Sequence, residues 1–147
     1  MNLRLRVLAM VVATSCLLVG PIHTARADAP TVKVTLNDQK GKAMTITLSQ
    51  AKAKAGPVSF QVTNASTDLV HEFLIAPWNG SIDSLPYDAK EQAVEEDKVR
   101  DLQGVEDMPA GTKATILLNL KPGKYVVFCN QIGHYKMGMV AAFTVTN

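Results

Sequence analysis

Cysteine and histidine are scarce in this chain. Its 147 residues include two cysteines, Cys16 and Cys129, and three histidines, His23, His71 and His134. An oxidase or a reductase with several histidine-ligated metal centres needs more imidazole ligands than this chain can supply. The sequence therefore disfavours an enzyme of that kind, and we expect a protein that is not itself an enzyme.

The chain also lacks a hydrophobic run long enough for a spanning helix at its N-terminus. The apolar run from Val7 to Val19 has thirteen residues, whereas a transmembrane helix needs about 20. Arg4 and Arg6 precede the run, and Ala25-Arg26-Ala27 follows it. This order is typical of a secretory signal peptide with cleavage after Ala27. We expect residues 1–27 to be removed and residues 28–147 to form one exported, periplasmic domain without a membrane span.

The expected mature chain has no large excess of either charge. The fifteen basic residues include Arg4, Arg6 and Arg26, so twelve remain against thirteen acidic residues. Proteins that bind nucleic acids or anionic membranes usually present a strong positive charge. The composition therefore favours neither partner.

Signal cleavage would leave a single cysteine. Cys16 and His23 would depart, so Cys129, His71 and His134 would be the remaining thiol and imidazoles. A lone cysteine cannot form an intramolecular disulfide, and a free thiol in an oxidising compartment is open to oxidation. A bound metal would occupy this thiol.

Eleven residues near the C-terminus carry most of the ligand chemistry. Residues 129–139 read CNQIGHYKMGM, which places a thiol, an imidazole and two thioethers close together. A thiolate, two imidazoles and a weakly bound thioether suit copper that changes between Cu(I) and Cu(II). His71 is the other available imidazole, and Met137 and Met139 are alternative thioether ligands.

The rest of the expected mature chain alternates between apolar and polar residues, as half-buried strands do. Turn residues separate the segments, and no repeat is visible. About seven such strands predict an all-β, antiparallel Greek-key β-sandwich. The expected strands lie near residues 31–36, 44–48, 58–63, 69–75, 112–120, 125–129 and 139–146.

One acidic insertion interrupts this pattern. Residues 83–107 contain nine acidic and three basic side chains. Ala89 to Leu102 has the composition of a short helix, with Glu96 and Arg100 at a favourable i,i+4 spacing. We interpret the insertion mainly as a solvated face, and a role in docking a basic partner is the alternative.

Several motifs together resemble the cupredoxin family of small blue copper proteins. Asn64 precedes His71-Glu72-Phe73, Tyr125 lies four residues before Cys129, and C-x4-H-x4-M spacing ends at Met139. The resemblance covers essentially the whole of the chain from residue 28. It departs at Glu72, where many members have Asn or Ser to tie the two ligand loops together, and at Ile132, where related loops often have Pro.

The resemblance implies one type 1 copper ion. His71, Cys129 and His134 would hold it in a trigonal plane, with Met139 as axial ligand and Met137 as the alternative. Met139 is favoured because it is in phase with the core residues of the last strand and follows Gly138, which lets the chain turn inward.

These assignments predict an exported one-electron carrier. All the strong ligands belong to the protein, so no position stays open for a substrate. We expect a monomer whose redox partner, an exported haem or copper protein, docks near His134 on an apolar patch of Ile132, Tyr135 and Met137. The alternative function is copper sequestration, or delivery of copper to another cuproprotein.

Overall fold

The computed structural model describes residues 29–38 and 43–147. The predicted signal peptide, residues 1–27, lies outside the described residues, as does part of the turn predicted at residues 38–41. None of the helices in the described residues is both long enough and apolar enough to cross a membrane.

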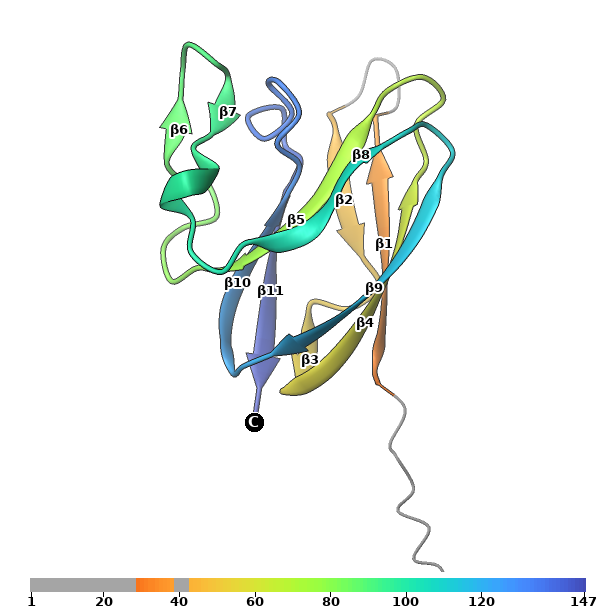
Figure 1. Ribbon diagram of the computed structural model, residues 1–147, viewed down its shortest axis with the longest axis vertical. Coiled ribbons are helices and arrows are strands. Elements are labelled where there is room, and N and C mark those ends of the chain that lie inside the picture. Colours follow the sequence, from red (N-terminus) through yellow and green to blue (C-terminus); the bar gives the residue numbers. More distant parts are fainter. Residues whose placement is uncertain (1–28, 39–42) are drawn as a thin grey trace, which may run out of the picture.

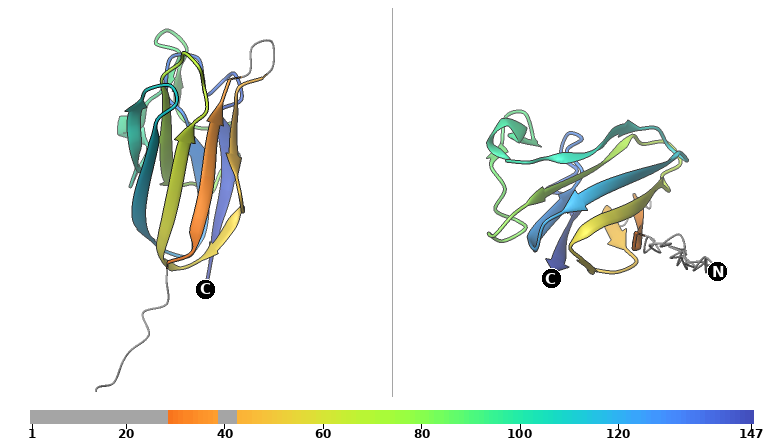
Figure 2. Two further views of the ribbon diagram at one scale, coloured as in Figure 1. Left: turned by 90° about the vertical axis from the view of Figure 1, so that its right-hand side faces the viewer. Right: turned by 60° about the horizontal axis from the view of Figure 1, so that its bottom comes forward.

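Two β-sheets pack face to face, which confirms the predicted all-β sandwich (Figure 1). The chain alternates between the sheets along its length, and both views in Figure 2 show them as two layers. The first sheet consists, in spatial order, of β2 (Thr45–Leu48), β1 (Thr31–Asn37), β4 (Gly56–Asn64) and β9 (Lys113–Leu120). The second consists of β3 (Lys52–Lys54), β11 (Val140–Thr146), β10 (Gly123–Phe128), β5 (His71–Pro77) and β8 (Gln103–Met108).

Aromatic rings join the two sheets in the core. The ring of Phe60 on β4 lies 5.1 Å from that of Phe73 on β5 and 5.5 Å from that of Phe143 on β11. Rings at such separations attract one another in addition to burying apolar surface. The predicted alternation is therefore realised, because one side chain in two on each of these strands enters the core.

Two strand pairs are parallel, although the sequence predicted an antiparallel sandwich. β1 pairs with β4, and β3 pairs with β11, in parallel register. In each case the chain visits the other sheet before it returns, so the returning strand is free to run in the same direction. Alternation shows which side chains face the core, but it carries no information on strand direction.

The insertion is not the helix expected over Ala89 to Leu102. Residues 83–107 contain β6 (Tyr87–Asp88), β7 (Ala93–Val94) and one turn of 3-10 helix, η1 (Glu96–Lys98). They also include most of β8, a strand of the second sheet that the sequence did not predict. The Asp88 side chain accepts hydrogen bonds from the backbone N–H groups of Lys90 and Glu91, which competes with helical hydrogen bonding. Gln92 and Asp101 have φ of 54° and 52°, outside the right-handed helical region. Lys98 pairs with Glu95, and no Glu96–Arg100 pair forms among the described residues.

The insertion covers the outer face of the second sheet. It explains why six consecutive residues of β5 are buried: Phe73 and Ile75 face the sandwich, whereas Leu74 and Ala76 face the insertion. Figure 1 shows β6, β7 and η1 beside this sheet. The buried members of this second cluster are Leu74, Ala76, Leu85, Val94, Val99, Val126, Phe128 and Tyr135.

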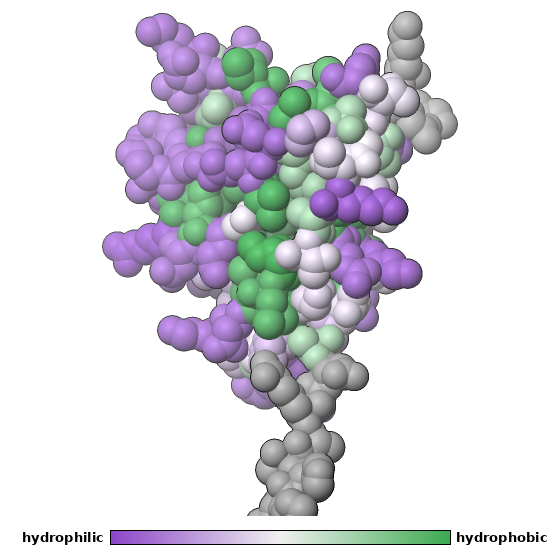
Figure 3. All heavy atoms as spheres, turned by 45° about the vertical axis from the view of Figure 1, so that its right-hand side comes forward, coloured by the Kyte–Doolittle hydropathy of each residue, from purple (hydrophilic) through white to green (hydrophobic). Residues whose placement is uncertain are grey.

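Figure 3 shows hydrophilic side chains on both flanks of this face, with hydrophobic residues along its middle and in smaller patches at the left and near the top. The large hydrophobic side chains exposed in the described residues are few. They are Val70, Leu117, Ile132 and Met137. Two of them, Ile132 and Met137, belong to the segment that carries the predicted ligands.

The strand that carries His71 is in very close contact with β8. The register between β5 and β8 shifts between His71 and Phe73. At Gly104 on β8, an added Cβ would lie 2.0 Å from the backbone oxygen of Phe73. A side chain at this position therefore requires the backbone of β5 to move.

We expect Gly104→Ala to lower the free energy of unfolding by about 3 kcal/mol or more, because overpacking here meets a backbone atom. Gly111→Ala is the matched control. It has open space and a φ of +74°, so it should cost only about 1–2 kcal/mol of backbone strain. Urea unfolding of both variants measures the difference, and equal losses would contradict this explanation.

Candidate metal centre

The predicted ligand segment forms the connection between β10 and β11, at the end of the sandwich opposite the C-terminus (Figure 1). Backbone hydrogen bonds close it into a compact loop: the N–H of Cys129 donates to Met139 O, and the N–H of Met139 donates to His134 O. Gly133 and Gly138 have φ of 79° and 106°, which side chains rarely tolerate. The two glycines allow the turns that bring the loop back on itself.

Three of the predicted ligands converge in the structure. The Nδ1 atoms of His71 and His134 are 3.2 Å apart. Cys129 Sγ lies 3.5 Å from His134 Nδ1 and 4.0 Å from His71 Nδ1. His71 and Cys129 are fully buried, and His134 is 8% exposed. His134 is therefore the one of the three nearest to solvent.

These separations fit a metal with trigonal ligands. Thiolate and imidazole bonds to such a metal are about 2.3 and 2.0 Å long, so the donor atoms of a planar trigonal site lie roughly 3.5–3.8 Å apart. Among the described residues, these three form the one group of at least three His, Cys, Asp or Glu side chains with this convergence. The donor set, one thiolate and two imidazoles, is that of a copper site.

The two methionines differ sharply in position. Met139 is fully buried in the same hydrophobic cluster as Cys129. Its backbone forms hydrogen bonds with the backbones of both Cys129 and His134. Met137 is 48% exposed. β11 begins at Val140, one residue later than expected, so Met139 ends the loop and does not begin the strand.

Burial favours the neutral forms of Cys129 and His134. Desolvation raises the pKa of the Cys129 thiol to about 11, although backbone N–H groups of Gln131 and Glu72 oppose the rise. Burial, with the neighbouring His71, lowers the pKa of His134. Near neutral pH, the thiol therefore holds its proton and the imidazole is uncharged. A metal that binds here displaces the thiol proton.

Glu72 connects the two segments that carry the ligands. Its backbone N–H donates to Cys129 Sγ at 3.2 Å. Its carboxylate accepts hydrogen bonds from the backbone N–H of Asn130 at 3.1 Å and from Gln131 Nε2 at 2.7 Å. Glu72 thus makes the link between loops that Asn or Ser is expected to make in the family.

Asn130 fastens the ligand loop to the insertion. Its Oδ1 accepts from the N–H of Val94 at 2.6 Å, and its Nδ2 donates to Val94 O and to Glu96 Oε1. The N–H of Gly133 also donates to Gln92 O at 2.8 Å. The insertion therefore braces the loop, which its charge composition did not indicate.

Tyr135 does not lie on the apolar patch predicted around His134. It is 3% exposed, and its hydroxyl donates to Ile82 O at 2.7 Å and accepts from the N–H of Leu85 at 3.2 Å. Ile82 immediately precedes the insertion and Leu85 belongs to it, so contacts at the start of the insertion hold the ring inward. Ile132 and Met137 remain exposed, at 71% and 48%.

The Asn64 side chain holds the chain segment just before β5 in place. Its Nδ2 donates to Leu69 O at 2.9 Å and to Met108 O at 2.8 Å. These bonds hold the connection before His71 against the end of β8. Sequence reasoning included Asn64 as part of the motif but missed the roles of Glu72, Asn130 and Asp38, whose Oδ1 lies 3.4 Å from His71 Nε2. The position of Glu72 next to a predicted ligand was the one available signal.

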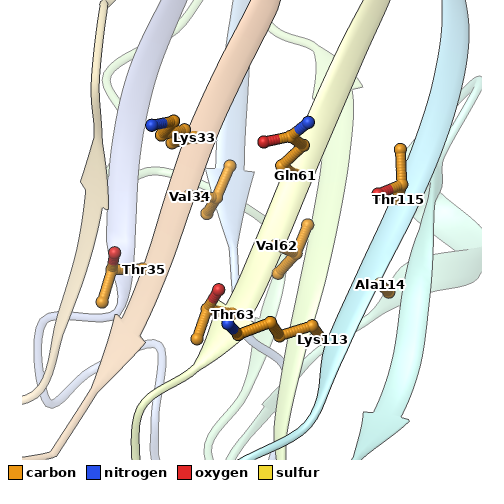
Figure 4. A pocket seen from close by; sticks show the side chains of 9 residues that line it. All are labelled: Lys33, Val34, Thr35, Gln61, Val62, Thr63, Lys113, Ala114 and Thr115. Carbon is orange, nitrogen blue, oxygen red and sulfur yellow. The ribbon is translucent and has the colours of Figure 1, made fainter.

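A shallow depression lies away from this centre, on the outer face of the first sheet. Its lining residues come from β1, β4 and β9 and include Lys33, Gln61 and Lys113 (Figure 4). None of its lining residues is a cysteine, histidine or carboxylate. It offers no ligand set for a transition metal.

The fold and the site define a β-sandwich protein with a buried centre of one thiol and two imidazoles, which is the class of small copper-binding proteins. A family model described as copper binding proteins of the plastocyanin/azurin family matches residues 31–146. The chain belongs to this family. The cupredoxin resemblance and the predicted copper cofactor are thereby confirmed.

Solved structures share the fold. Dithionite-reduced auracyanin from Roseiflexus castenholzii is 20% identical, with a TM-score of 0.56 over 81% of this chain and 98% of the other. Rusticyanin from Thiobacillus ferrooxidans is 17% identical, with a TM-score of 0.56 over 79% of this chain and 76% of the other. No curated protein sequence matches this chain significantly.

We expect Glu72→Ala to lower the unfolding free energy of the metal-free protein by about 1–3 kcal/mol, because it removes the acceptor of the Asn130 N–H and one of the two acceptors of Gln131 Nε2. Glu106→Ala, an exposed residue on neighbouring β8, is the control and should change stability by less than about 0.5 kcal/mol. Urea unfolding measures both, and a Glu72→Ala loss no larger than that of the control would refute the link.

Proposed function

We propose that this protein is an exported one-electron carrier whose single copper ion is held by His71, Cys129 and His134, with Met139 as axial ligand. The observation that carries the proposal is the convergence of three buried donor atoms within 4.8 Å of one another. Membership of the plastocyanin/azurin copper-binding family supports it. Copper bound there would supply a one-electron couple between Cu(I) and Cu(II).

The surroundings of the donors favour transfer over chemistry on a substrate. The donors sit on a strand end and on a loop fastened by Glu72, Asn130 and the insertion. A pre-organised set of this kind need not rearrange when the metal charge changes by one. Since the strong ligands all belong to the protein, we propose that it is not itself an enzyme.

The surface near His134 suits a transient partner. His134 is 8% exposed, and Ile132 and Met137 in the same loop are exposed apolar side chains. We propose that an exported haem or copper protein docks here, that the carrier is a monomer, and that residues 1–27 direct it to the periplasm. Small apolar patches with a polar rim are typical of such short-lived complexes.

A copper titration tests the site and its function together. Titration of the protein lacking residues 1–27 with Cu(II) should produce an intense visible thiolate-to-copper absorption that saturates at one equivalent. Cys129→Ser should abolish the band, and His134→Ala should weaken or shift it. A small haem protein should then bleach and restore the band reversibly without loss of metal.

Two results would count against this function. An unchanged band in Cys129→Ser would remove the proposed ligand. Slow redox cycling with rapid release of copper to a metal-free acceptor protein would favour copper delivery instead.

Substitution of each methionine by leucine distinguishes which of the two is the axial ligand. Met139→Leu should shift the visible absorption and raise the reduction potential, because it replaces a thioether beside Cys129 with a hydrocarbon of similar volume. Met137→Leu makes the same change at the half-exposed position and should leave the absorption unchanged. Absorption and potentiometry of both variants measure this, and the reverse pattern would make Met137 the axial ligand.

A further inference from the structure

The far side of His71 faces a buried carboxylate. Nδ1 of His71 is directed at the other donors, 3.2 Å from His134 Nδ1 and 4.0 Å from Cys129 Sγ. On the opposite side of the ring, Nε2 lies 3.4 Å from Asp38 Oδ1. Both atoms are buried, and neither has a hydrogen bond of good geometry to any other group in the described residues. The pair is therefore a close electrostatic contact at the outer limit of a hydrogen bond.

The contact joins the two sheets. Asp38 directly follows β1 of the first sheet, whereas His71 begins β5 of the second. His71 is fully buried, and the Asp38 side chain is 9% exposed. A buried polar atom without a partner is costly, so each atom is the available partner of the other.

Asp38 is charged at neutral pH. An aspartate carboxyl group is ordinarily ionised at this pH, and Asp38 Oδ1 lies 3.4 Å from His71 Nε2. A negative charge therefore stands against the ring nitrogen that faces away from the other donors.

The chemistry of a metal-bound imidazole explains this arrangement. When one ring nitrogen binds a metal, the other carries the proton and needs an acceptor, which is often a carboxylate. With Nδ1 on the metal, Nε2 would carry the proton, and Asp38 Oδ1 at 3.4 Å is the carboxylate oxygen beside it. A carboxylate in this place also makes the imidazole a stronger electron donor. Cu(II) carries the higher charge, so a stronger electron donor stabilises Cu(II) more than it stabilises Cu(I).

We propose that Asp38 is a positioning residue that holds His71 as the Nε2–H tautomer and stabilises Cu(II) relative to Cu(I), so that it lowers the reduction potential of the site. The inference rests on the proposed role of His71 as a ligand. The redox step is the gain of one electron by Cu(II), and no proton or bond changes place at Asp38.

The test compares Asp38→Asn with Asp68→Asn. Both remove one negative charge with little change of shape, but Asp68 is exposed in the connection before β5. Asp38→Asn should lower the ratio of Cu(II) to Cu(I) affinity about tenfold, which for a one-electron couple raises the midpoint potential by about 59 mV. Asp68→Asn should change it by less than a third of that. A simple stability role would change the unfolding midpoint but not the potential.

Two outcomes overturn the inference. One is a potential unchanged in Asp38→Asn, and the other is an equal change in both variants. Nuclear magnetic resonance of the Cu(I)-loaded natural protein provides a test that requires no variant to fold. A His71 Nε2–H proton shifted downfield by a carboxylate acceptor is expected, and a proton on Nδ1 refutes the proposal.

His71→Ala distinguishes this inference from the function on which it rests. If His71→Ala keeps the natural absorption band with Cu(II), His71 is not a ligand, and both proposals fail. If His71→Ala loses the band while Asp38→Asn leaves the potential unchanged, only the role of Asp38 fails.

Discussion

The structure depends on bringing three polar donor groups into one buried place. Cys129, His71 and His134 lie within hydrogen-bonding or ligand distance of one another and are almost completely removed from solvent. Such groups are costly to bury without partners. Burial disfavours the charged form of each group, and for this reason the pKa of Cys129 is raised and the pKa of His134 is lowered. A metal bound by all three would give each donor a partner at once.

The rest of the fold holds these groups in position. One donor begins β5, and the other two come from the loop between β10 and β11, so their separation depends on how firmly strand and loop are joined. Glu72 joins them directly, and Asn130 ties the loop to the insertion. The insertion packs a second hydrophobic cluster against the outer face of the sheet, which buries both faces of β5. The acidic insertion is thus a structural brace for the ligand loop as well as a charged surface.

The carboxylates of Glu72 and Asp38 make different contacts near the site. Glu72 lies on the side of the loop and accepts hydrogen bonds from its backbone and side chains, whereas Asp38 faces the ring of a donor from the other sheet. A charge placed at this distance from a metal ligand acts on the electronic properties of the ligand, while a charge that binds the loop acts on its rigidity. Glu72 thus contacts the loop, whereas Asp38 contacts the imidazole of His71.

The sequence by itself determined the strands of the sandwich except β3 and β8, together with the inward-facing residues and the candidate donor set. Alternation reveals burial because successive side chains on a strand point to opposite faces, and the scarcity of thiols and imidazoles left few possible ligands. The tertiary structure alone decided the parallel pairing of β1 with β4, the non-helical insertion, the inward turn of Tyr135, and the positions of Asp38 and Glu72. These features arise from contacts between residues far apart in the chain, such as Glu72 with Asn130 and Tyr135 with Ile82. Local patterns carry no record of such contacts, because the partner that decides each conformation lies in another segment.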